Sequence, residues 1–187
     1  IEPDRATFHR LAEQGNVVPL VRRLMSDQLT PVLGYRRLVS ADERTAPSFL
    51  LESVEGGAQA GRYSFVGAQP ALEVVARGFE VTVTDHRRCR SETTTEEDPL
   101  VVPRRLTASW DVVAPPADSA FTLPGFVGGW VGFAGFDTVR YLEPEQLPFA
   151  AAPPDDRHLP DLHFGLYREI AIFDDVSKVL HLSLIHI

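Results

Sequence analysis

Alternation of apolar and polar residues dominates this chain and predicts more strands than helices. In residues 79–84 every second residue is apolar, so we expect a strand with one buried face and one wet face. Similar patterns, rich in β-branched and aromatic residues, predict further strands. These lie at residues 16–24, 48–54, 62–68, 71–76, 163–173 and 176–182.

Helices are predicted where a capping residue precedes apolar residues at helical spacing. Asp4 can cap a helix that stops at Gly15, and Thr30 can cap a short helix that Pro31 opens and Leu38 ends. Strands outnumber helices and do not alternate with them as in a βαβ pattern, so the predicted fold class is α+β, sheet-dominated. A further helix is predicted at residues 99–110, which Pro103 would break or shorten, and a short helix or turn at residues 137–141.

Two segments lack a clear periodicity. Residues 86–98 are charged and rich in threonine, which favours a solvated loop or hairpin tip. Residues 121–136 carry no charge and contain several glycines, but lack the Gly-x-Gly-x-x-Gly order of a dinucleotide loop. We expect an apolar strand there, in which glycines mark bends and close approach of another backbone. Asp137 and Arg140, just beyond it, are expected to form a local ion pair.

Composition narrows the class of protein. A length of 187 residues with 44% hydrophobic and 24% charged residues is typical of one globular domain. The net charge of −8 argues against binding to nucleic acid, which needs a basic face. No apolar run is long enough to cross a membrane, and no signal peptide is recognisable, so we expect no membrane association and a cytoplasmic location.

The two ends suggest a fragment. The chain starts at Ile1 without an initiator methionine. Residues 182–187 read LSLIHI, which is also the translation of a transposon end used in sequencing libraries. We interpret residues 1–181 as native and 182–187 as a non-native tail; the alternative is that the tail is simply the end of an apolar strand. A missing downstream region is then expected to hold the chemistry.

The chain's own residues predict no catalytic or metal site. Cys89 is the single cysteine, which excludes an internal disulfide and a multi-cysteine zinc site. His158 and His163 lie close in sequence but have no third ligand nearby, so a chance pair is the simpler interpretation. No Gly-x-Ser-x-Gly nucleophile motif occurs.

Three segments carry a recognisable pattern: Gly15–Pro19 (GNVVP), Ser48–Val54 (SFLLESV) followed by Gly61–Gly67 (GRYSFVG), and Phe126–Phe133 (FVGGWVGF). Together they resemble the N-terminal region of anthranilate synthase component I, a chorismate-utilising enzyme family. The resemblance covers nearly the whole chain, to about His181, and implies a β-sandwich-like fold. Phe133 and Phe136 stand where tyrosines are usual, which removes two hydroxyls but is expected to keep the aromatic packing.

The resemblance implies a lyase of tryptophan biosynthesis. The full-length subunit of this family converts chorismate and ammonia to anthranilate and pyruvate, with ammonia supplied by a glutamine amidotransferase, component II. Mg²⁺ and chorismate are held by a C-terminal domain that this chain lacks, so no catalytic or metal-binding residue is assigned here. The N-terminal region of the family instead contributes most of the feedback pocket for L-tryptophan.

The Leu-Glu-Ser match places Leu51, Glu52 and Ser53 in that tryptophan pocket, with Arg62 as a further candidate. A strand end that turns from apolar to polar offers a wall for the indole and hydrogen-bonding groups for the ammonium and carboxylate. The alternative for Glu52 and Ser53 is a solvated strand end before a turn. We interpret Gly128–Trp130 as tight sheet packing, not ligand contact.

Two other functions stay open. The first is a different chorismate-using relative, such as aminodeoxychorismate synthase component I, in which a similar pocket can hold tryptophan as a structural ligand. The second is a stand-alone amino-acid-binding module. The segments Gly15–Pro19 and Gly61–Gly67 favour anthranilate synthase.

Overall fold

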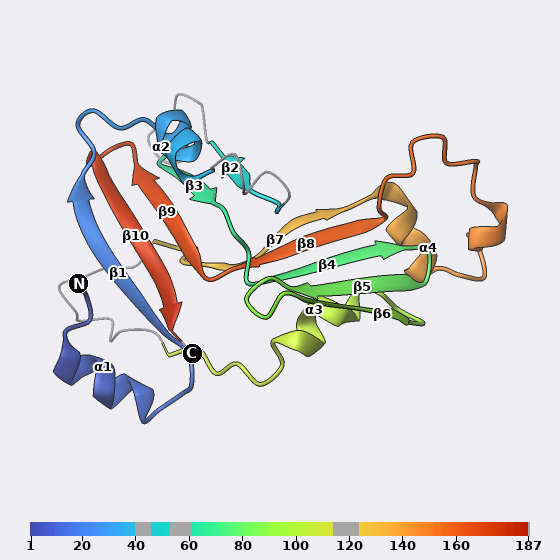
Figure 1. The fold of residues 1–187 in the computed structure, drawn as a ribbon, viewed down its shortest axis with the longest axis horizontal. Helices are drawn as coiled ribbons and strands as arrows, with labels where there is room; N and C mark the ends of the chain where they lie inside the picture. Colours follow the sequence, from blue (N-terminus) through green and yellow to red (C-terminus); the bar gives the residue numbers. More distant parts are fainter. Residues whose placement is uncertain (40–45, 53–60, 114–123, 187) are drawn as a thin grey trace. The chain divides into compact units, whose positions relative to one another are not determined.

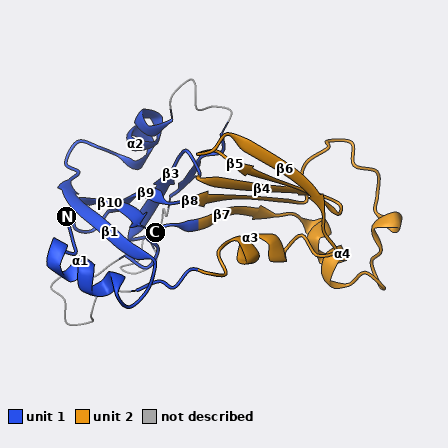
Figure 2. Cartoon of the chain, turned by 60° about the horizontal axis from the view of Figure 1, so that its bottom comes forward, with its two compact units in different colours: residues 1–70, 110–129, 167–187 blue, residues 71–109, 130–166 orange. Residues whose placement is uncertain are grey.

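The computed structural model describes residues 1–39, 46–52, 61–113 and 124–186. The chain forms two compact units, each assembled from separate stretches of sequence (Figure 2). Each unit contains a five-stranded sheet, and the strand pairs whose register is defined are antiparallel (Figure 1). The sheet-dominated α+β class is therefore confirmed. Unit 1 comprises residues 1–70, 110–129 and 167–187, and unit 2 comprises residues 71–109 and 130–166.

Unit 1 is built on a sheet with the strand order β1-β10-β9-β3-β2. Strand β1 is at the edge, as its proline predicts, because Pro19 has no N–H to donate to a second neighbour. The last strand continues through residues 182–186 and pairs with β1 as far as His186. The elements are α1 (Arg5–Ala12), β1 (Val18–Met25), α2 (Pro31–Leu38), β2 (Phe49–Leu51), β3 (Tyr63–Gly67), β9 (Glu169–Asp174) and β10 (Val179–His186).

Both predicted helix caps of unit 1 form. The carboxylate of Asp4 accepts a hydrogen bond from the N–H of Thr7 at 2.7 Å, and the hydroxyl of Thr30 accepts one from the N–H of Leu33 at 3.3 Å. Helix α2 lies against the sheet at Gly34, where an added Cβ would be 2.7 Å from the Phe173 ring. The missing side chain is what lets the helix approach this closely.

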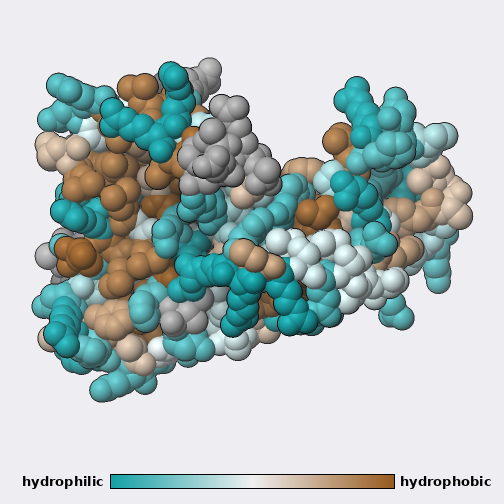
Figure 3. Space-filling model, in the orientation of Figure 1, coloured by the Kyte–Doolittle hydropathy of each residue, from teal (hydrophilic) through white to brown (hydrophobic). Residues whose placement is uncertain are grey.

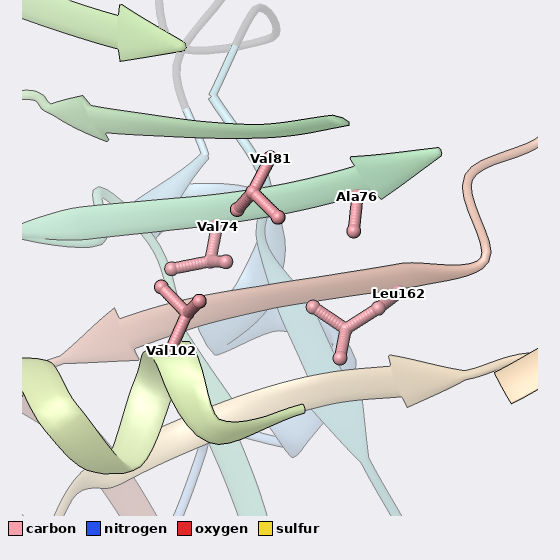
Figure 4. Packing of buried hydrophobic residues seen from close by; sticks show 5 residues of the cluster. All are labelled: Val74, Ala76, Val81, Val102 and Leu162. Atoms are coloured by element: carbon pink, nitrogen blue, oxygen red, sulfur yellow. The ribbon is translucent and has the colours of Figure 1, made fainter. Parts of the chain in front are cut away.

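Unit 2 has the strand order β6-β5-β4-β8-β7. Its core is formed by small aliphatic side chains of β4, β5 and β8, which helix α3 covers with Val102 (Figure 4). Of the expected buried face of β5, Val81 is fully buried, whereas Phe79 is 42% exposed. The elements are β4 (Leu72–Arg77), β5 (Glu80–Asp85), β6 (Arg90–Thr95), α3 (Val101–Leu106), β7 (Gly129–Ala134), η2 (Phe136–Thr138), α4 (Val139–Leu142), η3 (Phe149–Ala151) and β8 (Leu162–Tyr167).

Two strand predictions were wrong. Residues 163–173 were expected to form one strand, but the chain leaves the sheet of unit 2 after β8 and enters the sheet of unit 1 with β9. At the junction, Arg168 donates from its guanidinium to the carbonyl oxygen of Ile185 at 3.0 Å. Residues 86–98 were expected to be a loop or hairpin tip, yet residues 90–95 form β6, all of whose side chains are exposed. Backbone pairing with β5 defines that strand, and side-chain hydrogen bonds of Thr93 with Thr82 and of Ser91 with Thr84, both at 2.9 Å, also join the two strands.

The glycine-rich segment behaves as predicted where the structure describes it. A Cβ on Gly132 of β7 would lie 2.0 Å from the carbonyl oxygen of His163, so two backbones are in contact there. Beyond β7, Arg140 donates to Asp137 at 2.6 Å, which confirms the local ion pair, although Arg140 is buried. Phe133 packs edge-on against His163, whereas Phe136 is 86% exposed, so the expected aromatic packing fails at Phe136.

Candidate ligand-binding site

The segment predicted to bind tryptophan ends an edge strand of unit 1. Strand β2 stops at Leu51, which lies directly opposite Phe65 of β3. The Leu51 side chain is 51% exposed, and Glu52 is exposed as well. Ser53 lies outside the described residues. Two of the four predicted residues are thus placed on an accessible strand end.

Arg62, the fourth predicted residue, is held by a buried carboxylate. It precedes β3 and donates from Nη2 to Oδ2 of Asp174 at 2.7 Å, while its Nε lies 3.2 Å from both carboxylate oxygens. The Asp174 side chain is 3% exposed and that of Arg62 is 49% exposed. The guanidinium also lies over the Tyr63 ring, 4.9 Å from its centroid. Among the described residues, Asp174 is the hydrogen-bond partner that fixes Arg62.

Asp174 is in turn anchored by the turn that follows β9. Its Oδ1 accepts hydrogen bonds from the N–H groups of Val176 at 3.1 Å and Ser177 at 3.2 Å. Burial raises the pKa of Asp174, but hydrogen bonds from Arg62, Ser177 and Val176 outweigh burial and hold that pKa well below its ordinary value. The same pairing raises the pKa of Arg62. Both groups are therefore charged at neutral pH.

An apolar wall lies on the same face of the sheet as this ion pair. Directly opposite residues of paired strands point to one face, so the register groups Leu51 with Phe65 and Tyr63 with Asp174. Tyr63 and Phe65, two residues apart on β3, share that face. Phe65 also packs edge-on against Phe126, with ring centroids 5.7 Å apart. The arrangement offers an aromatic surface beside a guanidinium.

His181 of β10 belongs to the same face, because it pairs with Ile172 of β9, which pairs with Phe65. It is 7% exposed. Burial lowers its pKa, and the nearby positive charge of Arg23 lowers it further. The imidazole is thus neutral at pH 7.

Two hollows among the described residues do not contain the predicted site residues. One of about 610 Å³ in unit 1 is lined by Leu38 of α2, Val66, Ala171 and Leu182. Because Leu182 pairs with Ala171, these residues point to the opposite face from Leu51 and Phe65. Hydrophobic residues gather over the sheet of unit 1 in Figure 3. The other hollow, of about 550 Å³ in unit 2, is lined by residues 77 and 78 and by some of the residues in the ranges 133–137 and 149–161.

Metal-ligating side chains do not converge in the part of the chain that the structure describes. No group of three or more His, Cys, Asp or Glu residues there is arranged to hold a metal ion. His163 is hydrogen-bonded to Glu73 at 2.7 Å, and His158 lies in a loop with a positive φ of 53°. Cys89 is exposed at the turn between β5 and β6. No helix among the described residues is long and apolar enough to cross a membrane.

Sequence reasoning missed Asp174 as part of this region. Asp174 and Asp175 fall between the predicted strands at residues 163–173 and 176–182, a position that indicates only a hairpin turn. Its partner Arg62 lies 112 residues away in sequence, and no local pattern signals such a contact. The aromatic residues Tyr63 and Phe65 were recognised only as part of the Gly61–Gly67 motif. Strand alternation on β3 was the signal that could have placed them on one face.

Known proteins are similar to this chain along most of its length, although no protein-family model matches it. The chain is 53% identical over 170 residues to anthranilate synthase alpha subunit 1, chloroplastic, of Arabidopsis thaliana, covering 87% of this chain and 28% of that protein. It is 34% identical over 178 residues to anthranilate synthase component 1 of Synechocystis sp., covering 95% of this chain and 32% of that protein.

Among solved structures, the chain is similar to anthranilate synthase component I from Streptococcus pneumoniae TIGR4. The TM-score is 0.44 with 22% identity, and the match covers 89% of this chain and 31% of that one. The chain therefore spans less than a third of the length of these relatives. It is a homologue of anthranilate synthase component I over a segment that makes up between 28% and 32% of those curated proteins.

Proposed function

We propose that this chain is the N-terminal, tryptophan-sensing part of an anthranilate synthase component I. The parent would convert chorismate and ammonia to anthranilate and pyruvate, with feedback inhibition by L-tryptophan and a cytoplasmic location. The observation that carries the proposal is the 53% identity along 87% of the chain to an anthranilate synthase alpha subunit. The exposed end of β2 beside Arg62 and an aromatic face supports a site for an aromatic amino acid.

The remaining parts of the reaction are assigned to the parent outside this chain. We propose that ammonia comes from a glutamine amidotransferase, component II, either separate or fused. Mg²⁺ and chorismate would be bound beyond the segment matched here. The described residues do not fit a magnesium site, because no acidic or histidine group of three converges among them. We therefore assign no metal-dependent step of the reaction to residues of this chain.

A chimera tests the sensing role. This chain replaces the matching segment of the Arabidopsis alpha subunit 1, and the half-inhibitory concentration of L-tryptophan is measured for anthranilate formation. Replacing Ser53 with Arg is expected to raise that concentration at least about tenfold, because the larger cation blocks the pocket and repels the ligand's ammonium. Ser53→Ala, which deletes only a hydroxyl, is expected to raise it less. An unchanged concentration in Ser53→Arg would contradict the proposed pocket.

The chain alone provides the complementary test. Incubated with chorismate, ammonia and Mg²⁺, it is expected to form no anthranilate above a control without protein, because the groups that bind chorismate are assigned elsewhere. Fluorescence detection of anthranilate measures the rate. Anthranilate formation by the chain alone would contradict the proposal that the groups that bind chorismate lie outside this chain.

A further inference from the structure

The guanidinium of Arg62 has two usable edges, and Asp174 occupies one of them. The contacts to Asp174 come from Nε and Nη2, which form the side-on edge of the planar group. The opposite edge, formed by Nη1 and the second N–H of Nη2, points away from Asp174. The Arg62 side chain is 49% exposed although its other edge faces the buried Asp174, and we infer that the exposed part includes the outer edge.

Asp174 holds this arrangement rigidly. Its carboxylate is fixed by two backbone N–H groups of its own turn. The backbone of that turn is also tied to Arg62, because the N–H of Asp175 donates to the carbonyl oxygen of Arg62 at 2.8 Å. Asp175 thus holds the backbone of Arg62 and Asp174 holds its guanidinium. Stacking on Tyr63 restricts the side chain further. A preorganised cation loses little entropy when an anion binds.

The surroundings of the outer edge favour one class of anion. Tyr63, Phe65 and Leu51 give the same sheet face an aromatic and apolar surface. A ligand with a flat apolar side chain and a carboxylate can contact both features at once. An aromatic amino acid is one such ligand, and it is the ligand class of the proposed function.

We propose that Asp174 is a positioning residue of the tryptophan site, fixing Arg62 so that its outer edge receives the carboxylate of the bound amino acid. This inference rests on the proposed function and adds to it which ligand group Arg62 recognises and what orients Arg62. Asp174 itself touches no ligand atom. Its effect on binding is transmitted through the guanidinium.

The experiment uses the chimera described above and two probes, L-tryptophan and L-tryptophanamide. The amide keeps the indole and the ammonium but has no carboxylate. In Asp174→Asn, inhibition by tryptophan is expected to weaken about tenfold or more, while inhibition by the amide changes less than about twofold. Arg62→Lys is also expected to weaken inhibition by tryptophan more than inhibition by the amide. An ammonium keeps the charge but cannot bridge the carboxylates of Asp174 and the ligand in a fixed plane. The double variant Arg62→Gln with Asp174→Asn is expected to be inhibited by tryptophan as well as Arg62→Gln alone, because Asp174 has no effect on binding once the guanidinium is gone.

Asp85→Asn is the matched control. Asp85 also accepts hydrogen bonds from the N–H groups two and three residues later, both at 3.0 Å, and pairs with an arginine, Arg88. It lies in unit 2, so it reports the effect of weakening such a turn without touching the proposed site. We expect the ratio of the two inhibition constants to be unchanged in this variant.

The outcomes separate the two proposals. If the unmodified chimera is not inhibited by tryptophan, the proposed function fails. If it is inhibited but Asp174→Asn keeps the preference for tryptophan over the amide, or weakens both probes equally, the positioning role of Asp174 is wrong and the proposed function stands. Should Asp174→Asn not fold, Asp174→Glu keeps the charge but displaces the carboxylate from the Arg62 edge, and the same ratio decides the question.

Discussion

Replacing Gly132 with Ala tests the closest backbone contact in unit 2. The added Cβ would lie 2.0 Å from the carbonyl oxygen of His163 and 2.6 Å from the Cα of Phe164. Both atoms are backbone, so neither can rotate away as a flexible side chain would. Strand β7 must instead move by more than an ångström, which distorts its pairing with β8.

Overpacking of this kind costs about 1–3 kcal/mol, and two opposing backbone atoms place Gly132→Ala at the upper end, near about 3 kcal/mol. For a chain of this length that corresponds to a fall in melting temperature of roughly 6–12 °C. Thermal unfolding followed by far-ultraviolet circular dichroism measures it. Gly125→Ala is the control, because no heavy atom lies within 4 Å of its added Cβ. Equal melting temperatures for the two variants would refute the described contact between β7 and β8.

Three further predictions concern the core and titrating groups. Leu162 is 1% exposed, so Leu162→Ala should lower the free energy of unfolding in urea by about 3 kcal/mol; a loss below about 1 kcal/mol would remove it from the core. Tyr141→Phe should cost about 1 kcal/mol, since the buried hydroxyl donates to the carbonyl oxygen of Gly78 at 2.5 Å. Burial also raises the pKa of Tyr141 above 10.0, so the parent chain should lose stability above that pH and Tyr141→Phe should lose less. Burial lowers the pKa of His181 from 6.5, so stability should fall as the pH drops below that value, because the unfolded imidazole binds a proton that the folded one does not. In urea titrations, the free energy of unfolding should fall less between pH 7 and pH 5 for His181→Gln than for the parent chain. Equal falls in the two proteins would contradict the lowered pKa of His181.

Features encoded by neighbouring residues could be predicted from the sequence. Asp4 and Thr30 cap their helices because the capping bond spans only three residues. The alternation in β5 buried Val81 as expected. The close approach at Gly132 was also anticipated, because a glycine within an apolar strand signals a missing side chain.

Features set by distant pairing could not be predicted. Strand β6 buries no side chain, so it carries no hydrophobic period, and only its hydrogen bonds to β5 define it. The break at Arg168 separates two apolar stretches, β8 and β9, and the two charged residues at the junction, Arg168 and Glu169, do not show that the stretches belong to different sheets. For the candidate site, sequence identified Arg62 by resemblance, but its contact with Asp174 depends on the pairing of β3 with β9.

The strand order of unit 1 also bears on how the chain folds during synthesis. Strand β1 has β10 as its neighbour in the sheet, and β10 is made about 160 residues later. At typical translation rates of about 5–20 residues per second, β1 waits roughly 10–30 s for its partner. The β4–β5–β6 meander of unit 2 needs only adjacent residues and is complete long before then. Of the strands in this sheet, β1 is made first and is among the last to be paired, and for that interval its edge toward β10 is open to chaperones and to mispairing with other nascent chains.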